Sequence, residues 1–331
     1  MRALISILTG MLLTLGILGA IGVGGFLYIQ KAFQQPGSLA DDRVIVIPPG
    51  TGVEGIANLL RKNGVIDNPL IFQLGVRLNG TARSLQAGEF RFSAGSSPQE
   101  VMGVLVAGVT VQRFLTVAEG LTTSTVLDMI RSTPDLSGPI TLSPAEGDLL
   151  PETYSYQRGE DRTVVLKRMI AAHDEALARL WAERDPNIPL KTPMEAVILA
   201  SIVEKETAVA AERPRVAAVF VNRLNKGMRL QSDPTVIYGL SDGTGRLERR
   251  LTRTDLRTAH DYNTYVIRGL PPRPIANPGV ASLEAVLHPP KTDEYYFVAD
   301  GTGGHAFART LDEHNRNVAR WRKIQRDRGE R

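Results

Sequence analysis

The chain has no cysteine among its 331 residues. This absence excludes disulfide bonds, thiolate metal sites and cysteine nucleophiles. The five histidines are scattered without the spacing of a metal site. Neither a Walker loop, a dinucleotide-binding fingerprint nor a G-x-S-x-G motif occurs, and Ser201 and Lys205 lie four residues apart where the S-x-x-K motif needs three. We therefore expect neither a cofactor nor a bound metal.

The chain also lacks a strong excess of charge of either sign. The net charge is +4, the isoelectric point is about 9.4, and lysine and arginine are interleaved with aspartate and glutamate almost throughout. The basic stripe with interleaved aromatic residues that marks nucleic-acid binding is missing, so we expect no nucleic-acid partner. An anionic membrane or cell-wall polymer suits this charge equally well. At 43% hydrophobic and 22% charged residues, the composition is that of a globular protein.

The N-terminus contains one long apolar run. Residues 3–30 include no charge and no proline, and as a helix they span roughly 40 Å, more than the ~30 Å of membrane hydrocarbon. The alternative is a cleaved signal peptide, with small residues at 38–41 as the cleavage site, but such peptides have shorter apolar runs. We predict an uncleaved transmembrane anchor over residues 1–30. Arg2 before it and Lys31 after it give almost no orientation signal.

The rest of the chain divides into a linker and two domains of an α+β protein. Residues 31–42 form a polar linker, and residues 43–117 a small α+β domain with strand patterns at "RVIVI", "GEFRF" and "TVQRFLTV". Its predicted helices are "GVEGIANLLRKNG", "NPLIFQLGVRLNG" and "SPQEVMGVLVAG", the last with a capping box. Residues 118–331 form a larger, helix-rich α+β domain. It has helices at 161–184, from Thr192, and at 213–227, a turn-like segment at 230–239, a late strand in "EYYFVAD" and a polar helical tail from Leu311.

One predicted helix places a carboxylate in apolar surroundings. Thr192, Pro193 and Glu195 mark its start, and the apolar run up to Val203 indicates burial on most sides. Glu204 follows on the face of small residues, and burial of such a carboxyl favours its protonated form, as a general acid requires. The alternative is an ordinary helix end, with Glu204 paired to Lys205 or an arginine. Glu206 lies about 200° further round the helix, so the two carboxylates do not easily share one substrate.

The next helix and the segment after it carry further polar residues. Arg223 falls within the apolar stripe of helix 213–227, where a guanidinium needs a carboxylate or a ligand unless it reaches outward to solvent. The segment "LQSDPTVIYG" then places Gln231, Asp233, Thr235 and Tyr238 close together, although each alone is an ordinary turn residue.

Several long motifs resemble one family in order and spacing. "EGDLLPETY", "ILASIVEKET", "ERPRVAAVFVNRLNKGMRLQSDPTVIYG", "NTYVIRGLPPRPIANPG" and "HPPKTDEYYFV" are similar to segments of the YceG-like (MltG) endolytic murein transglycosylases. The resemblance runs from the anchor to about residue 320. It implies a single-pass protein of the inner (cytoplasmic) membrane with its catalytic domain on the outer, periplasmic side. It also implies that the domain at 43–117 is LysM-like and helps to hold glycan strands.

The resemblance also implies a reaction. The family cuts the β-1,4 bond between N-acetylmuramic acid and N-acetylglucosamine in nascent peptidoglycan, leaving 1,6-anhydro-muramic ends, and its catalytic glutamate falls on Glu204 as acid and then base. An ordinary glycosidase uses two carboxylates, so a lone carboxylate without a partner fits this chemistry. The matching motifs supply candidate substrate-binding residues: Glu152, Tyr154, Asn222, Arg223, Gln231, Asp233, Thr235, Tyr238, Asn263 and Tyr265.

Two other functions remain open at this stage. One is a non-catalytic glycan-binding scaffold for wall synthesis. The other is a muramidase-type hydrolase in which Glu204 works with Asp233 or Glu152. By resemblance we also expect association with peptidoglycan synthases.

Overall fold

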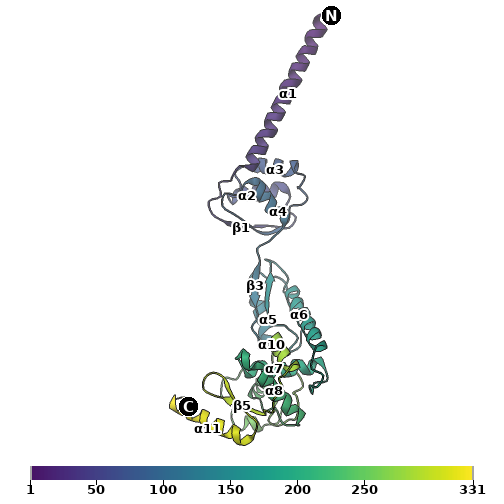
Figure 1. Cartoon of the computed structure of the whole chain (residues 1–331). Helices are drawn as coiled ribbons and strands as arrows, with labels where there is room; N and C mark the ends of the chain where they lie inside the picture. Colours follow the sequence, from purple (N-terminus) through teal and green to yellow (C-terminus); the bar gives the residue numbers. More distant parts are fainter. Residues whose placement is uncertain (1, 330–331) are drawn as a thin grey trace. The chain divides into compact units, whose positions relative to one another are not determined.

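A computed structural model describes residues 2–329, which form two compact units that divide between Arg113 and Phe114. Figure 1 labels many of the helices and strands of this α+β chain. The helices are α1 (Arg2–Gln34), α2 (Val53–Lys62), α3 (Pro69–Leu78), α4 (Pro98–Ala107), α5 (Thr123–Ser132), α6 (Arg162–Ala182), α7 (Pro193–Glu206), α8 (Arg213–Asn225), α9 (Asp233–Leu240), α10 (Val280–Leu287) and α11 (Leu311–Asp327). The strands are β1 (Arg43–Ile47), β2 (Gly88–Phe92), β3 (Arg113–Thr116), β4 (Thr153–Tyr156), β5 (Tyr296–Ala299) and β6 (His305–Ala308), and short 3₁₀ helices cover Ala210–Glu212 and Asp255–Arg257.

The apolar run at the N-terminus is a single helix, α1. Within the described residues, Leu8–Gln34 is long and apolar enough to cross a membrane, with a mean hydropathy of 2.1. Its side chains are exposed from Leu8 to Tyr28, and burial begins only beyond that point. The last turn belongs to the small domain, because Phe33 is buried in that domain's core.

The small domain is built on two antiparallel strands. β1 pairs with β2 so that Arg43 lies opposite Phe92 and Ile47 opposite Gly88. Alternate residues of these strands, with the inner faces of α2, α3 and α4, form one apolar core. The helix ends follow their sequence signals. Ser97 and Glu100 form the predicted capping box at the start of α4, and the Asn68 side chain accepts the Leu70 amide at the start of α3 (2.9 Å).

The second unit starts with a smaller core near its N-terminal end. β3 pairs with β4 in a two-stranded sheet, and α5 and α6 pack with these strands around Val126, Leu149, Val165 and Met169. The predicted helix at 161–184 is confirmed as α6, which begins after Asp161, whose carboxylate accepts the Thr163 amide (2.7 Å).

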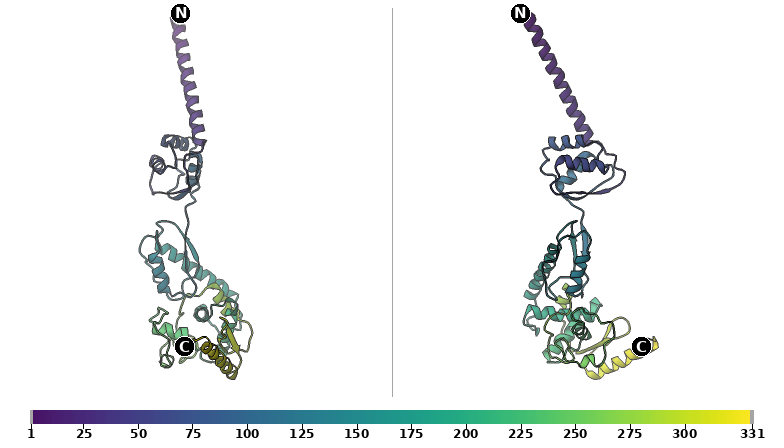
Figure 2. Two further views of the ribbon diagram at one scale, coloured as in Figure 1. Left: turned by 90° about the vertical axis from the view of Figure 1, so that its left-hand side faces the viewer. Right: turned by 180° about the vertical axis from the view of Figure 1, so that it is seen from behind.

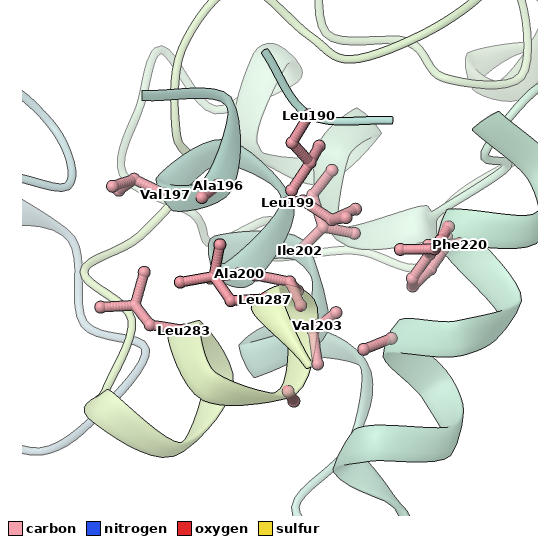
Figure 3. Packing of buried hydrophobic residues seen from close by; sticks show 14 of the residues in the cluster. Leu190, Ala196, Val197, Leu199, Ala200, Ile202, Val203, Phe220, Leu283 and Leu287 are labelled. Atoms are coloured by element: carbon pink, nitrogen blue, oxygen red, sulfur yellow. The ribbon is translucent and has the colours of Figure 1, made fainter. Parts of the chain in front are cut away.

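Helix α7 is the centre of the larger core of this unit. Every residue from Ala196 to Val203 is buried, and α7 packs against α6, α8 and α10. Figure 3 shows side chains of α7 converging with Phe220 of α8 and Leu283 and Leu287 of α10. The start of α7 is also as predicted, since the Thr192 hydroxyl accepts the Glu195 amide (3.2 Å) and Pro193 fills the first turn.

The C-terminal part adds a hairpin and a helix. β5 and β6 pair antiparallel with Tyr296 opposite Ala308, and Phe297 packs edge-on against Phe220 of α8 (ring centroids 5.8 Å apart). The helix α11 lies against both strands, and the two views in Figure 2 show it beside this hairpin. The predicted strand and tail helix are therefore confirmed.

The segment predicted as a turn at 230–239 is largely a helix instead. α9 covers Asp233–Leu240, with Ser232 at its cap position. An Asp-Pro pair suits a turn, but proline is equally at home in the first turn of a helix, where no amide donor is needed. Tertiary packing decides between the two, because Val236 is fully buried.

Candidate active site

A cavity of about 500 Å³ opens where the C-terminal end of α7 meets α8, α9, β5 and α11. Its walls come from segments more than a hundred residues apart in the sequence, from Glu206 to His314. Charged and polar side chains line one part, and apolar and aromatic side chains line the rest. The lining residues are Glu206, Arg223, Gln231, Asp233, Tyr265, Tyr296, Phe297, Val298, Leu311 and His314.

Glu206, the last residue of α7, lines this cavity. Burial raises its pKa to about 7, and the negative charge of Asp233 acts in the same direction. The hydroxyl of Ser232 and the charges of His305 and Arg223 oppose this shift without cancelling it. Glu206 is therefore a carboxyl group that holds and releases a proton near neutral pH.

Gln231, Asp233 at the start of α9, and Tyr265 form a polar part of the cavity wall. Gln231 adopts a left-handed backbone (φ 51°), unusual for a residue other than glycine. Its amide donates to the Thr264 carbonyl (3.1 Å), which fixes this turn. The Tyr265 hydroxyl donates to the carboxylate of Asp233 (2.7 Å), which holds that second carboxylate in place. Strained backbone of this kind is tolerated where surrounding contacts determine it, often at functional sites.

Arg223 and His314 complete the charged part of the wall. The Arg223 guanidinium donates to the Tyr295 and Leu230 carbonyls (both 2.6 Å), and burial lowers its pKa. The sequence left open whether this arginine points inward or reaches outward to solvent, and in the structure it is buried. His314 of α11 stacks on Tyr296 with ring centroids 5.2 Å apart. Burial and the nearby Arg223 charge lower the pKa of His314, which favours a neutral imidazole.

Glu204 lies in a different environment from Glu206. Its carboxylate accepts from Arg213 Nη2 (3.3 Å) and from the Gly279 amide at the start of α10 (2.9 Å). Only 5% of its side chain is exposed, and the same guanidinium also pairs with Glu119. Glu204 is therefore paired with an arginine, and it is not among the described residues that line the cavity. The alternative noted from the sequence, an arginine pair at a helix end, describes its surroundings.

The remaining sequence candidates divide into residues behind the cavity wall and residues elsewhere. Thr235 and Asn263 are fully buried and shape the wall: Thr235 shares a hydrogen bond with Thr264 (2.9 Å), and Asn263 accepts the Tyr265 amide (3.0 Å). Asn222 donates to the carbonyls of Thr292 (2.9 Å) and Glu294 (3.0 Å).

The last three candidates are likewise not among the residues that line the cavity. Tyr154 is a core residue whose hydroxyl donates to the Leu150 carbonyl (2.7 Å). Tyr238 donates to Glu146 (3.1 Å), a carboxyl whose pKa burial raises. Glu152 is exposed. The cavity therefore unites four of the predicted residues, namely Arg223, Gln231, Asp233 and Tyr265.

Sequence reasoning missed Glu206 and His314. Glu206 follows Glu204 by two residues, and only the position of the cavity distinguishes their faces. His314 sits in a helix predicted as polar packing, and no local pattern connects it to α7. The signal for both is spatial, because α11 and β5 line the same cavity as the end of α7.

The arrangement has clear chemical capacities. A carboxyl with a pKa near 7 can act as a general acid and then as a general base at neutral pH. A second carboxylate and a guanidinium supply charge nearby. The amide, phenol and aromatic side chains suit the hydroxyl and acetamido groups and the apolar faces of sugar rings.

Comparison with known proteins gives consistent matches. The YceG-like family matches residues 45–320. An endolytic murein transglycosylase of Bacillus subtilis is 33% identical over 88% of this chain and 89% of its own length. One from Streptococcus pneumoniae serotype 2 is 28% identical over 93% of this chain and 64% of its own length. The crystal structure of a YceG-like protein from Listeria monocytogenes superposes with a TM-score of 0.51 at 30% identity, over 84% of this chain and 99% of that one.

Proposed function

The chain belongs to the YceG-like family, and from that premise we propose that it is a membrane-anchored lytic transglycosylase of peptidoglycan. It cuts the β-1,4 bond between N-acetylmuramic acid and N-acetylglucosamine within nascent glycan strands and leaves 1,6-anhydro-muramic ends. The observation that carries the proposal is Glu206, a carboxyl group with a pKa of about 7 facing a cavity of about 500 Å³. Its relatives are named endolytic murein transglycosylases.

The reaction needs one group that gives a proton and then takes one. Protonated Glu206 donates its proton to the glycosidic oxygen as the bond from that oxygen to C1 of the muramic ring breaks. The resulting carboxylate accepts the proton of the C6 hydroxyl as O6 bonds to C1. The leaving sugar gains a hydroxyl, the muramic ring closes, and Glu206 ends protonated again without consuming water.

The neighbours of Glu206 support this cycle. Asp233 raises the proton affinity of Glu206 and places negative charge near the positively charged, oxocarbenium-like sugar. Tyr265 holds Asp233 through its hydroxyl. Gln231 and His314 offer hydrogen-bonding groups for the sugar, and Tyr296 offers an aromatic face.

We assign the catalytic role to Glu206 in preference to Glu204, on two grounds. Glu204 is occupied by Arg213 and the Gly279 amide, whereas Glu206 faces the cavity. The polar residues that the family motifs supply also gather around Glu206, as Arg223, Gln231, Asp233 and Tyr265 show. Glu204 then has a structural role, joining the end of α7 to the starts of α8 and α10.

One alternative has a specific observation in its favour. Asp233 lies in the same cavity as Glu206, so the pair resembles the two carboxylates of an ordinary glycosidase, and a hydrolase would use Asp233 to activate water or attack C1. The non-catalytic scaffold has no such observation in its favour.

Product analysis separates the three functions. Purified, uncross-linked peptidoglycan is digested with the full-length protein in detergent, and the new glycan ends are weighed by mass spectrometry. Ends lighter by one water than a reducing sugar are expected. Ends that retain the water would identify a hydrolase, and an absence of new ends would identify the scaffold.

The rest of the chain fits this assignment. We propose that α1 anchors the protein in the cytoplasmic membrane, with both units on the outer, periplasmic side where peptidoglycan lies. A protease added to intact spheroplasts should degrade both units. We propose that the small domain is LysM-like and holds glycan strands, so that variants on its surface lower binding to insoluble peptidoglycan. We also propose association with peptidoglycan synthases, and purification of the full-length protein from membranes without any synthase would count against it.

A further inference from the structure

Helix α3 of the small domain has an apolar stripe that no part of the described chain covers. Leu70, Leu74 and Leu78 are 64%, 39% and 51% exposed. Their spacing of four residues places them on one side of the helix, within about 80° of arc. The opposite side is buried through Phe72 and Val76. α3 is therefore apolar on both sides, although the core needs only one of them.

The position of α3 indicates what covers this stripe. Helix α1 ends against α3, where the ring of Phe33 packs on the backbone of Gly75 so closely that an added methyl group there would overlap the ring. Figures 1 and 2 both show α3 running across the end of α1, on the side of the domain from which α1 leaves. The chain leaves this unit on the side opposite α1.

The depth of this contact matches a membrane surface. The apolar run of α1 ends at Gln30, and Lys31 is the first charge after it. Phe33 lies three residues beyond Gln30, which is about 5 Å along the helix axis. A helix packed on Phe33 therefore lies at the level of the lipid headgroups, where interfacial helices bury an apolar face about 5–10 Å deep.

Positive charges near the leucine stripe also suit a membrane surface. Arg77 is exposed and lies about 20° from Leu70 around the helix, within the same side as the leucines. Exposed Lys31 lies at the end of the apolar run. Both cations can reach lipid phosphates while their aliphatic parts stay among the leucines.

We propose that α3 is an interfacial helix, whose leucine stripe (Leu70, Leu74 and Leu78) lies in the surface of the membrane that α1 crosses. The inference rests on the proposed membrane span and is independent of the reaction. Together with Phe33 it gives the small domain two attachments to the bilayer, so the domain keeps a fixed orientation at the membrane instead of swinging on a single helix.

The absence of cysteine makes a direct test possible, because one introduced cysteine is the only site for a thiol-reactive dye. Three full-length variants are labelled with an environment-sensitive fluorophore: Leu74→Cys in the stripe, Val109→Cys as an exposed apolar control after α4, and Leu18→Cys inside α1. Each is reconstituted into vesicles of phosphatidylcholine and phosphatidylglycerol, with and without lipids that carry a spin-label quencher at a shallow or a deep position.

The proposal predicts a blue-shifted dye at position 74 that shallow quenchers extinguish more than deep ones, while position 109 is unaffected. Position 18 reports the span itself, and deep quenchers should extinguish it. If position 18 is quenched but position 74 behaves like position 109, the interfacial helix is refuted and the anchor stands. A blue shift at position 74 without lipid quenching would mean that a second copy or another protein covers the stripe. A lack of quenching at position 18 would refute the anchor.

Discussion

The pH dependence of cleavage follows from the raised pKa of Glu206. The cycle starts with the protonated acid, so kcat/KM of the free enzyme should follow its protonated fraction. For a pKa of about 7 that fraction is about 0.99 at pH 5, about 0.91 at pH 6, about 0.5 at pH 7 and about 0.09 at pH 8. A glutamate at its model value of 4.5 would fall from about 0.24 to about 0.03 between pH 5 and pH 6.

The two cases therefore differ clearly between pH 5 and pH 6. We expect kcat/KM to be nearly constant over this range, whereas an ordinary glutamate would make it fall about eight-fold. The assay is the initial rate of release of soluble fragments from uncross-linked peptidoglycan, with intrinsic fluorescence as a check of folding at each pH. Asp233→Asn provides the perturbation. It removes a charge that raises the pKa of Glu206, so the midpoint of the falling limb should move to lower pH. A steep fall between pH 5 and pH 6, or an unmoved midpoint in this variant, would refute the reasoning.

Three further predictions follow from named contacts. Glu206→Gln should raise the free energy of unfolding at pH 8 by about 2–3 kcal/mol, measured by denaturant unfolding. The folded carboxyl gives up its proton near pH 7 and the unfolded one near pH 4.5, so the unaltered protein loses stability as pH rises through that window. Equal stability of the two proteins at pH 8 would contradict this. Tyr265→Phe should lower kcat/KM by about ten-fold or more, because it removes the hydroxyl that holds Asp233. The same change at Tyr154, whose hydroxyl donates to a core carbonyl, should cost about 1 kcal/mol of stability and leave turnover unchanged. Similar turnover in both variants would contradict a functional role for the Tyr265 hydroxyl. Gly75→Val should destabilise the small domain by about 1–3 kcal/mol through its clash with Phe33, measured by thermal unfolding in detergent, and an unchanged midpoint would mean that α1 is not packed there.

Local signals in the sequence were enough to place most helices and strands. The Ser97 capping box, the Thr192 cap and the alternating strand at 43–47 depend on residues a few positions apart, and each behaves in the structure as local chemistry requires. The segment at 230–239 was misjudged because Asp-Pro suits both a turn and the first turn of a helix, and burial of Val236 decides between them.

The sequence predicted several of the residues of the site, but it did not predict how they are arranged. The motifs supplied Arg223, Gln231, Asp233 and Tyr265, which the fold brings into one cavity. The choice between two glutamates two residues apart depends on which of them faces the cavity that α11 and β5 also line, and that is set by segments about a hundred residues apart in the sequence. The sequence offered Lys205 or an arginine as a possible partner of Glu204 without identifying which, and in the structure Arg213 reaches it from the start of the next helix.

A matched pair of variants tests the central claim that Glu206 is the single acid and base. Glu206→Gln and Glu204→Gln make the same isosteric change at two positions of one helix, and both are compared with the unaltered protein for the rate at which anhydro-muramic ends form from uncross-linked peptidoglycan. Loss of a positioned general acid costs roughly 10²–10⁴-fold in rate. We predict that loss for Glu206→Gln and a change of less than about ten-fold for Glu204→Gln, because the Glu204 carboxylate is held by Arg213 and the Gly279 amide and does not line the cavity. Near-normal formation of anhydro ends by Glu206→Gln together with loss of activity in Glu204→Gln would contradict the account.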